Sequence, residues 1–318
     1  MRISHNMVGM RMMAAVQQNL EELVRAQERM STGKKINRPS DDPTAANRVM
    51  EMRIALNHNY QWSRNITDGL SWLYETDAVL DDATGLLQKA REIAVQGANG
   101  TLTREDQAVL ARQVEGIIDG MTKVANSQLG GKYIFAGAET ATRPYTVDLG
   151  TGEVYYEPVK QGLPGATAPV LREVAVEHRV RVDAGLEDAG GGTYVGVFGE
   201  VDGSGNVTNG VFQTLFALRD ALDAGDTTQI SNLIGEIDQR IDHLMEARVK
   251  IGSRTNHLES LKDQYMDQEI RFTAVISSLQ DSDLGRVTIE FTQREIAYRA
   301  SLAAGARLMQ TTLIDFLR

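Results

Sequence analysis

Residues 230–279, ISNLIGEIDQRIDHLMEARVKIGSRTNHLESLKDQYMDQEIRFTAVISSL, decide the fold of this 318-residue chain. An apolar or aromatic residue recurs at every seventh position of the stretch, and no proline interrupts it. A sustained heptad of this kind is typical of a helix that packs along its length against other helices. At about 1.5 Å per residue the helix would be roughly 75 Å long. We therefore expect an elongated rod with a partner helix of matching length.

The partner is expected in a second long helical pattern, which runs from Pro43 to about Gln96. Its apolar residues have the same spacing, so the two helices are predicted to form an antiparallel coiled coil. The predicted seam consists of Ile66, Leu73, Leu80, Leu87, Ile230, Ile237, Leu244, Ile251, Leu258, Tyr265 and Phe272. Thr103 followed by Asp106 resembles a capping box, which predicts the start of a third, shorter helix.

Both ends of the chain, residues 1–36 and 286–318, carry amphipathic helical patterns. We expect them to form a pair of terminal coiled-coil helices, because no other segment offers them an obvious partner. A single pairing cannot cover two wide apolar stripes, so the remaining surface is predicted to bind neighbouring subunits. In the free subunit these ends are expected to be frayed and to fold on assembly. The predicted assembly residues are Met13, Val16, Leu20, Leu23 and Met30 in the first helix and Ile296, Tyr298, Leu302, Met309, Leu313 and Phe316 in the last.

Between the two helical halves, residues 138–209 contain many glycines and prolines and alternate with a period of two. Residues 145–148 and 153–157 flank a glycine-containing loop and predict a β-hairpin. The alternation from Val174 to Val182 predicts one strand with a solvated face. The predicted fold is mainly α, with this small β domain inserted and facing outward. The central bundle of long helices is assigned to residues 37–137 and 210–285.

The composition excludes several classes of function. The formal net charge of −10 argues against a nucleic-acid partner, which would need clustered Lys and Arg residues. The absence of cysteine removes disulfides, thiolate nucleophiles and the commonest structural zinc sites. No apolar run reaches the roughly 18 residues of a membrane span, so no membrane insertion is expected. The first residues lack the apolar core of a signal peptide, which predicts a cytoplasmic protein or one exported without a cleaved signal.

The sequence offers no catalytic residues, no cofactor site and no metal site. No two of the five histidines are four residues apart, a common metal-ligand spacing on helices. The run Gly190-Gly191-Gly192 lacks the Lys and the Ser or Thr that follow in a phosphate-binding loop. The carboxylates fall on outward helix faces, where solvation is their ordinary role. We therefore expect a structural protein and not an enzyme.

Several short motifs lie mainly in the two helical halves of the chain, residues 1–137 and 211–318. They are MRISHNM at 1–7, STGKKINRPSDDP at 31–43, RNITDGL at 64–70, GGKYIFAGAETATRPY at 130–145, ARVKIGSR at 247–254 and LIDFLR at 313–318. In combination these motifs resemble the flagellin superfamily, and within it the hook–filament junction proteins. Flagellins usually have an alanine–glycine sequence after the paired aspartates, whereas Pro43-Thr44-Ala45-Ala46 follows them here. The ARVKIGSR motif is expected to break the long helix.

The resemblance implies a structural axial protein of the bacterial flagellum, which joins the hook, through hook-associated protein 1, to the flagellin filament. Such proteins form a ring of subunits through their terminal helices. They leave the cell by flagellar type III export without a cleaved signal peptide, which implies an extracellular location at the hook–filament junction. An export chaperone is implied at the C-terminal helix. The alternatives are a filament flagellin and, in another class, a cytoplasmic coiled-coil adaptor or signalling protein.

Overall fold

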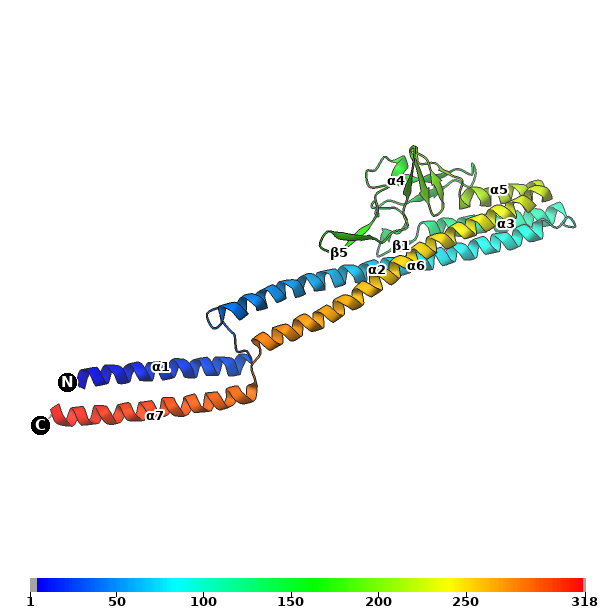
Figure 1. The fold of residues 1–318 in the computed structure, drawn as a ribbon. Coiled ribbons are helices and arrows are strands. Elements are labelled where there is room, and N and C mark those ends of the chain that lie inside the picture. Colours follow the sequence, from blue (N-terminus) through cyan, green and yellow to red (C-terminus); the bar gives the residue numbers. More distant parts are fainter. Residues whose placement is uncertain (1–4, 317–318) are drawn as a thin grey trace. The chain divides into compact units, whose positions relative to one another are not determined.

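The computed structural model describes the backbone of residues 5–316 and the side chains of residues 7–307. The chain falls into two compact units, one formed by the residues up to Tyr60 and from Asp267 onward, the other by Gln61–Met266. Helices dominate both units (Figure 1). They are α1 (His5–Thr32), α2 (Pro43–Gly97), α3 (Arg104–Ala125), α4 (Glu157–Lys160), α5 (Val211–Ala224), α6 (Thr227–Gln280) and α7 (Leu284–Phe316).

In the first unit, α1 and α7 lie side by side (Figure 1). Gly33 follows α1 with a left-handed backbone (φ 68°), a common way for a helix to end. Asp42 caps α2, because its carboxylate accepts the backbone N–H of Ala45 at 2.9 Å. Asp283 caps α7 in the same way and accepts the backbone N–H of Gly285 at 2.9 Å. The helix ends are therefore encoded locally by these polar residues and glycines.

In the second unit, α2 and α6 pack against each other in an antiparallel arrangement. Ion pairs flank their contact: Arg91 on α2 binds Asp238 at 2.6 Å, and Arg248 on α6 binds Asp77 at 2.9 Å. A row of buried side chains runs along the two helices, within the span of these pairs and beyond it. They are Ile66, Leu73, Leu80, Leu87, Ile230, Ile237, Leu244, Ile251, Leu258 and Tyr265. Phe272, the last residue of the predicted seam, belongs to the first unit and is half-buried.

The third helix begins where its capping box predicts. The Thr103 hydroxyl accepts the backbone N–H of Asp106 at 3.2 Å, and the Asp106 carboxylate accepts the backbone N–H of Thr103 at 3.2 Å. This reciprocal arrangement satisfies two of the donors that a helix start leaves free. The helix α3 then packs against α5.

The strands in the inserted segment and just before it are short, and the described pairs are all antiparallel. A four-stranded sheet has the order β10-β9-β8-β7. The predicted hairpin around residues 145–157 is present as β3 and β4. The strands are β1 (Gln128–Leu129), β2 (Lys132–Tyr133), β3 (Tyr145–Val147), β4 (Val154–Tyr156), β5 (Leu171–Ala175), β6 (His178–Arg181), β7 (Glu187–Gly190), β8 (Thr193–Gly196), β9 (Gly199–Val201) and β10 (Val207–Thr208).

An aromatic cluster joins the inserted strands to the neighbouring helices in one core. The Phe198 ring meets that of Phe135 edge-on, with 5.0 Å between centroids, and lies 6.3 Å from Phe212 on α5. Tyr145 packs between Tyr156 and Phe198 at 5.3 and 5.4 Å. Burial raises the pKa of both tyrosines far above the ordinary phenol value, because the charged form would lose its hydration. The insert and α5 therefore share their apolar interior.

Two local predictions are wrong. The segment from Val174 to Val182 is a hairpin of β5 and β6, with Glu177 in the turn at a φ of 57°. The ARVKIGSR motif does not break the long helix, because α6 continues through it. Its Gly252 faces open space, and one glycine in a helix costs only about 1 kcal/mol. Burial of the adjacent Ile251 offsets that cost.

The fold class predicted from the sequence is confirmed: the chain is mainly α, with long helices and a small inserted β region. Among the described helices, none combines the length and the apolar character that a bilayer crossing requires.

Candidate assembly surfaces

The contact between α1 and α7 is narrow and has ion pairs along it. Glu22 pairs with Arg294, and Arg29 pairs with Glu290 at 3.4 Å, which sets the two helices antiparallel. Between these pairs the small side chain of Ala26 is buried. Few apolar side chains of the two helices are fully covered, so this pairing alone leaves much of their apolar surface exposed.

The predicted assembly residues of α1 fall into two groups, one half-buried and one exposed. Val16, Leu23 and Met30 are half-buried, on the side of α1 that carries Ala26. Met13, by contrast, is 61% exposed, and Leu20 is also exposed. An amphipathic stripe wider than one helix contact produces this division, since a single neighbour covers only its central rows. The exposed half is free to meet another molecule.

The stripe on α7 divides in the same manner. Tyr298 is half-buried, whereas Ile296 is 62% exposed and Leu302 is exposed. The backbone of α7 includes the last three predicted assembly residues, but their side chains lie outside the described part of the chain. These residues are Met309, Leu313 and Phe316.

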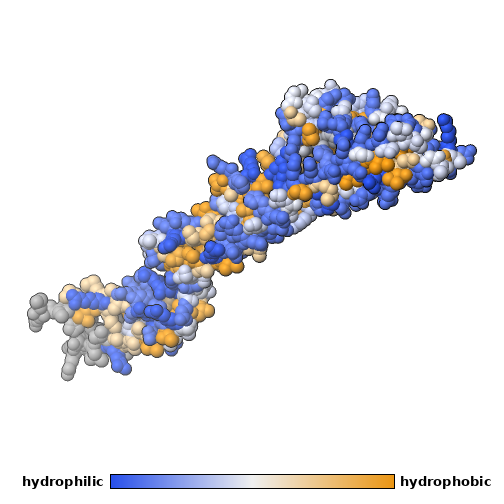
Figure 2. All heavy atoms as spheres, turned by 45° about the vertical axis from the view of Figure 1, so that its right-hand side comes forward, coloured by the Kyte–Doolittle hydropathy of each residue, from blue (hydrophilic) through white to orange (hydrophobic). Residues whose placement is uncertain are grey.

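The structure also reveals exposed apolar side chains that are not among the predicted assembly residues. Met10, which is 68% exposed, and Val24 continue the exposed stripe of α1, and Ile289 lies one heptad before Ile296 on α7. Figure 2 shows hydrophobic residues reaching the surface of this helix pair. The spacing of Met10, Met13, Leu20 and Val24, three, seven and four residues, could have predicted this second row.

In the first unit, the segment that connects α1 to α2 and the segment that connects α6 to α7 are hydrogen-bonded to each other. The backbone N–H of Lys35 donates to the Gln280 carbonyl at 2.8 Å, and the backbone N–H of Ser282 donates to the Gly33 carbonyl at 2.9 Å. Ile36 is buried beside these bonds. The segment between α1 and α2, a polar connector in the sequence, is therefore held by backbone hydrogen bonds.

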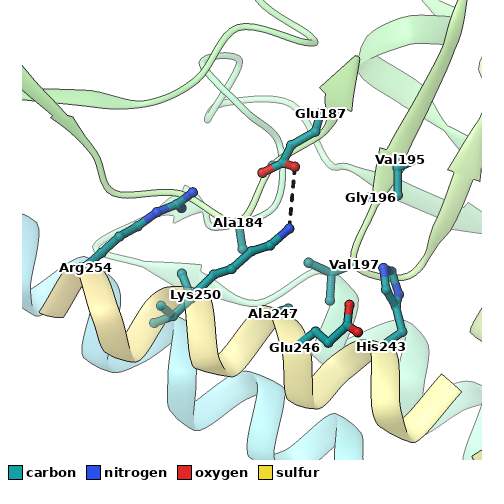
Figure 3. Close-up of a pocket in the computed structure, with 12 residues that line it drawn as sticks. Ala184, Glu187, Val195, Gly196, Val197, His243, Glu246, Ala247, Lys250 and Arg254 are labelled. Atoms are coloured by element: carbon teal, nitrogen blue, oxygen red, sulfur yellow. Dashed lines mark ion pairs between the residues drawn. The ribbon is translucent and has the colours of Figure 1, made fainter. Parts of the chain in front are cut away.

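A small pocket of about 60 Å³ lies between α6 and the inserted strands (Figure 3). Lys250 pairs with Glu187 at 3.6 Å, and Arg254 donates to the main-chain carbonyl of Asp183 at 2.7 Å. Burial lowers the pKa of Arg254, and the neighbouring positive charge of Arg181 lowers it further. One ion pair and one hydrogen bond to the main chain thus link the helix and the insert at this pocket. Within the described residues, no three His, Asp or Glu side chains are grouped to hold a metal ion.

The long antiparallel helices and the paired terminal helices define a flagellin-like protein. The family model of the bacterial flagellin N-terminal helical region matches residues 3–140. The particular resemblance is to flagellar hook-associated protein 3. The protein of that name from Escherichia coli (strain K12) is 28% identical, with 96% of this chain and 96% of that protein covered.

Two further proteins are similar over most of this chain. The crystal structure of the flagellar junction protein FlgL from Legionella pneumophila covers 74% of this chain and 100% of its own, with a TM-score of 0.56 at 18% identity, and supports the fold. The flagellin of Bacillus subtilis (strain 168) is 25% identical over 98% of this chain and 97% of its own. The predicted resemblance to hook-associated protein 3 and to the flagellin superfamily is confirmed. The chain is thus similar to structural proteins of the flagellum.

Proposed function

We propose that this chain joins the flagellar hook to the flagellin filament as an axial protein and assembles through α1 and α7. The observation that carries the proposal is the apolar stripe that α1 and α7 leave uncovered, with Met13 and Leu20 on one helix and Ile296 on the other. Similarity to hook-associated protein 3 over almost the whole chain supports the same role.

The energy for assembly comes from burying this stripe. Complete burial of a large apolar side chain contributes about 1.5–3 kcal/mol. Several such residues lie in one row on each helix, so neighbouring helices with similar stripes gain by packing against them. The proposed partners are hook-associated protein 1 on the hook side, flagellin on the filament side and further copies of this chain in a ring.

The same surface explains why a chaperone would be needed before export. An uncovered apolar row on α7 invites non-specific association inside the cell. We assign the chaperone to the C-terminal helix, which includes Ile296, Tyr298 and Leu302. Export through the flagellar type III apparatus without a cleaved signal then delivers the protein to the extracellular hook–filament junction.

Each part of the chain has a mechanical role in this proposal. Residues 1–36 and 286–318 form the inner assembly helices, and residues 37–137 and 210–285 form the long-helix bundle. Residues 138–209 form the outward-facing β region. No part is assigned an enzymatic role, a cofactor, a metal or a nucleic-acid contact.

Substitution in the exposed row of α1 tests the proposal. Leu20→Glu places a charge in the stripe, whereas Gln18→Glu places the same charge at an exposed polar position of the same helix. In cells that lack their own hook-associated protein 3, we expect the wild-type chain and Gln18→Glu to restore filaments, and Leu20→Glu to leave bare hooks. Normal filaments with Leu20→Glu would reject α1 as the assembly surface.

Filament flagellin is the second candidate, because the Bacillus subtilis flagellin also matches nearly the whole chain. A gold-labelled antibody separates the two functions. A junction protein is labelled once, at the base of each filament, whereas a flagellin is labelled along its length. Purified flagellin also elongates from filament seeds, while a junction protein stops at short assemblies.

A further inference from the structure

Three side chains of α2 and α6 reach the inserted segment by donating to its main-chain carbonyls. Asn65 Nδ2 on α2 donates to the Glu173 carbonyl at 2.8 Å. On α6, Arg254 Nη1 donates to the Asp183 carbonyl at 2.7 Å, and the Tyr265 hydroxyl donates to the Val174 carbonyl. Figure 3 shows Arg254 extending from α6 toward the insert. We call Asn65, Arg254 and Tyr265 the latch residues.

In the insert, the accepting carbonyls belong to backbone segments that other contacts hold in position. The register of β5 and β6 shifts between Glu173 and Ala175, so Val174 has no paired residue on β6 and its carbonyl can accept the Tyr265 hydroxyl. Val174 itself is fully buried. A bulge of this kind redirects the backbone locally, and here it turns one carbonyl toward α6.

The carbonyl of Asp183 is held just as firmly. Its own carboxylate is buried and accepts the backbone N–H groups of Val170 at 2.8 Å and Gly185 at 2.7 Å. Arg181 donates to both carboxylate oxygens at 3.0 Å. A buried carboxylate with this many donors fixes the loop, so the main-chain oxygen offered to Arg254 has a defined position.

The helices also approach the insert closely at this place. A Cβ atom added to Gly69 on α2 would lie 3.1 Å from a Val182 methyl carbon, so only glycine fits there without a shift. Tyr265 is buried, and its ring lies 5.6 Å from that of Trp62. The motifs RNITDGL and ARVKIGSR thus contribute Asn65, Gly69 and Arg254 to a single contact.

The side-chain ion pairs across the same contact are more exposed. Arg172 pairs with Asp68 at 2.7 Å, and Lys250 pairs with Glu187 at 3.6 Å. Asp68, Lys250 and Glu187 are each about half exposed or more, and pairs of this kind contribute little to stability. The main-chain contacts of Arg254 and Tyr265 are more sheltered, whereas that of Asn65 is exposed. All three bond to the backbone, so they do not depend on which side chains the insert carries.

We propose that Asn65, Arg254 and Tyr265 form a latch that fixes the inserted strands on α2 and α6 through their main chain. The position of the insert is then set by the helices, and side chains on the outer faces of β5 and β6 can change without releasing it. The latch residues thus bind two features of the same chain: the β5–β6 hairpin with its bulge, and the loop that the buried Asp183 carboxylate fixes. The latch does not rest on the flagellar function proposed above.

Hydrogen exchange of the full-length protein, followed by mass spectrometry, tests the latch. The triple variant Asn65→Ala, Arg254→Met and Tyr265→Phe removes the three donors. The matched control, Asp68→Ala with Lys250→Ala, removes the two exposed ion pairs from the same helices. We expect exchange in residues 171–186 to rise more than about tenfold in the triple variant and no more than about threefold in the control. Exchange in α2 and α6 should stay unchanged.

Two results would overturn the latch. One is wild-type exchange of residues 171–186 in the triple variant, and the other is equal loosening in the control. If the triple variant fails to fold, Tyr265→Phe alone keeps the aromatic ring and should still accelerate exchange in β5. The third arm replaces exposed insert side chains, with Leu171→Ala and Val176→Ala together, and should leave the protection of β5 and β6 as in the wild type. Loss of protection there would show that side chains hold the insert.

Discussion

Glu22 on α1 forms an ion pair with Arg294 on α7, and the neighbouring pair, Arg29 with Glu290, has the opposite polarity. Each helix therefore carries one acidic and one basic residue toward the other. A shift of the helices that brought Arg29 to Arg294, or Glu22 to Glu290, would oppose like charges. The two pairs favour the observed register over its neighbours, as charged flanking positions do in coiled coils.

The first prediction follows from this polarity. The variant Glu22→Arg faces Arg294 with a like charge and should weaken the pairing of α1 with α7. The double variant Glu22→Arg with Arg294→Glu restores opposite charges and should recover most of the pairing. A charge swap that rescues the single variant is the signature of a direct interaction.

An engineered disulfide measures this pairing. Met12 side-chain carbons lie 3.8 Å from the Cβ position of Gly305, and the chain contains no cysteine of its own. In a Met12→Cys, Gly305→Cys background, Glu22→Arg should slow disulfide formation roughly threefold to tenfold. Equal rates in all three charge states would show that the ion pairs have no influence on the register.

The second prediction concerns the row of buried residues between α2 and α6. Leu258 is buried and lies 3.2 Å from the Cβ position of Gly69. Leu258→Ala removes buried methyl groups and leaves a cavity, so it should lower the free energy of unfolding by about 2–5 kcal/mol. Urea denaturation monitored by circular dichroism measures this loss.

A matched substitution on the same helix provides the control. Val249 is 70% exposed, and Val249→Ala should change the free energy of unfolding by no more than about 0.5 kcal/mol. If Leu258→Ala unfolded at the wild-type urea concentration, Leu258 would not belong to the stabilising seam.

The long helices could be predicted because burial on one side of a helix repeats with a fixed period. Ile237, Leu244 and Ile251 are recognisable at seven-residue spacing, and each is buried. The β5–β6 hairpin could not be predicted in this way. Val176 and Glu177 form a two-residue turn, so the alternation of apolar and polar residues stays in phase in both strands. Glu177 has a positive φ, although glutamate is not a residue type that favours one.

The assembly surfaces were predictable only in part. An apolar stripe in the sequence does not reveal how much of its surface one neighbouring helix covers. Met13 and Val16 belong to the same predicted stripe, yet one is exposed and the other half-buried. The latch contacts have no sequence signature on the insert side at all. Main-chain carbonyls such as that of Val174 are present in every residue, so only the fold reveals which of them accept a bond.

The third prediction is a loss of stability at alkaline pH. Burial raises the pKa of Tyr145, Tyr156 and Tyr265 above the ordinary phenol value. A group whose pKa is raised on folding contributes its full stabilisation below the unfolded-state pKa of about 10, and loses it as the pH rises toward the folded-state value. The second unit should therefore become steadily less stable above about pH 10.

The variant Tyr145→Phe isolates this effect. It removes one buried phenol and retains the ring, so the melting temperature should fall less steeply between pH 10 and pH 11 than in the wild type. The same two proteins compared at pH 7 report the packing cost alone. Parallel curves for both proteins at alkaline pH would contradict the assignment of the pH dependence to buried tyrosines.

The fourth prediction concerns the terminal helices of the free subunit. In α1 and α7, Ala26 and Val287 are buried, whereas Met13, Leu20 and Ile296 are exposed. With so little apolar surface covered, each helix should open often in the monomer, because helices in proteins gain most of their stability from packing against other elements. Backbone amides of α1 and α7 should therefore exchange much faster than those between Ile237 and Leu258 on α6, and should become protected when the subunits assemble. Hydrogen exchange on the monomer and on hook–filament preparations measures both states. Slow exchange throughout α1 and α7 in the monomer would mean that the pair is already stable, and that assembly adds a neighbour to a folded surface.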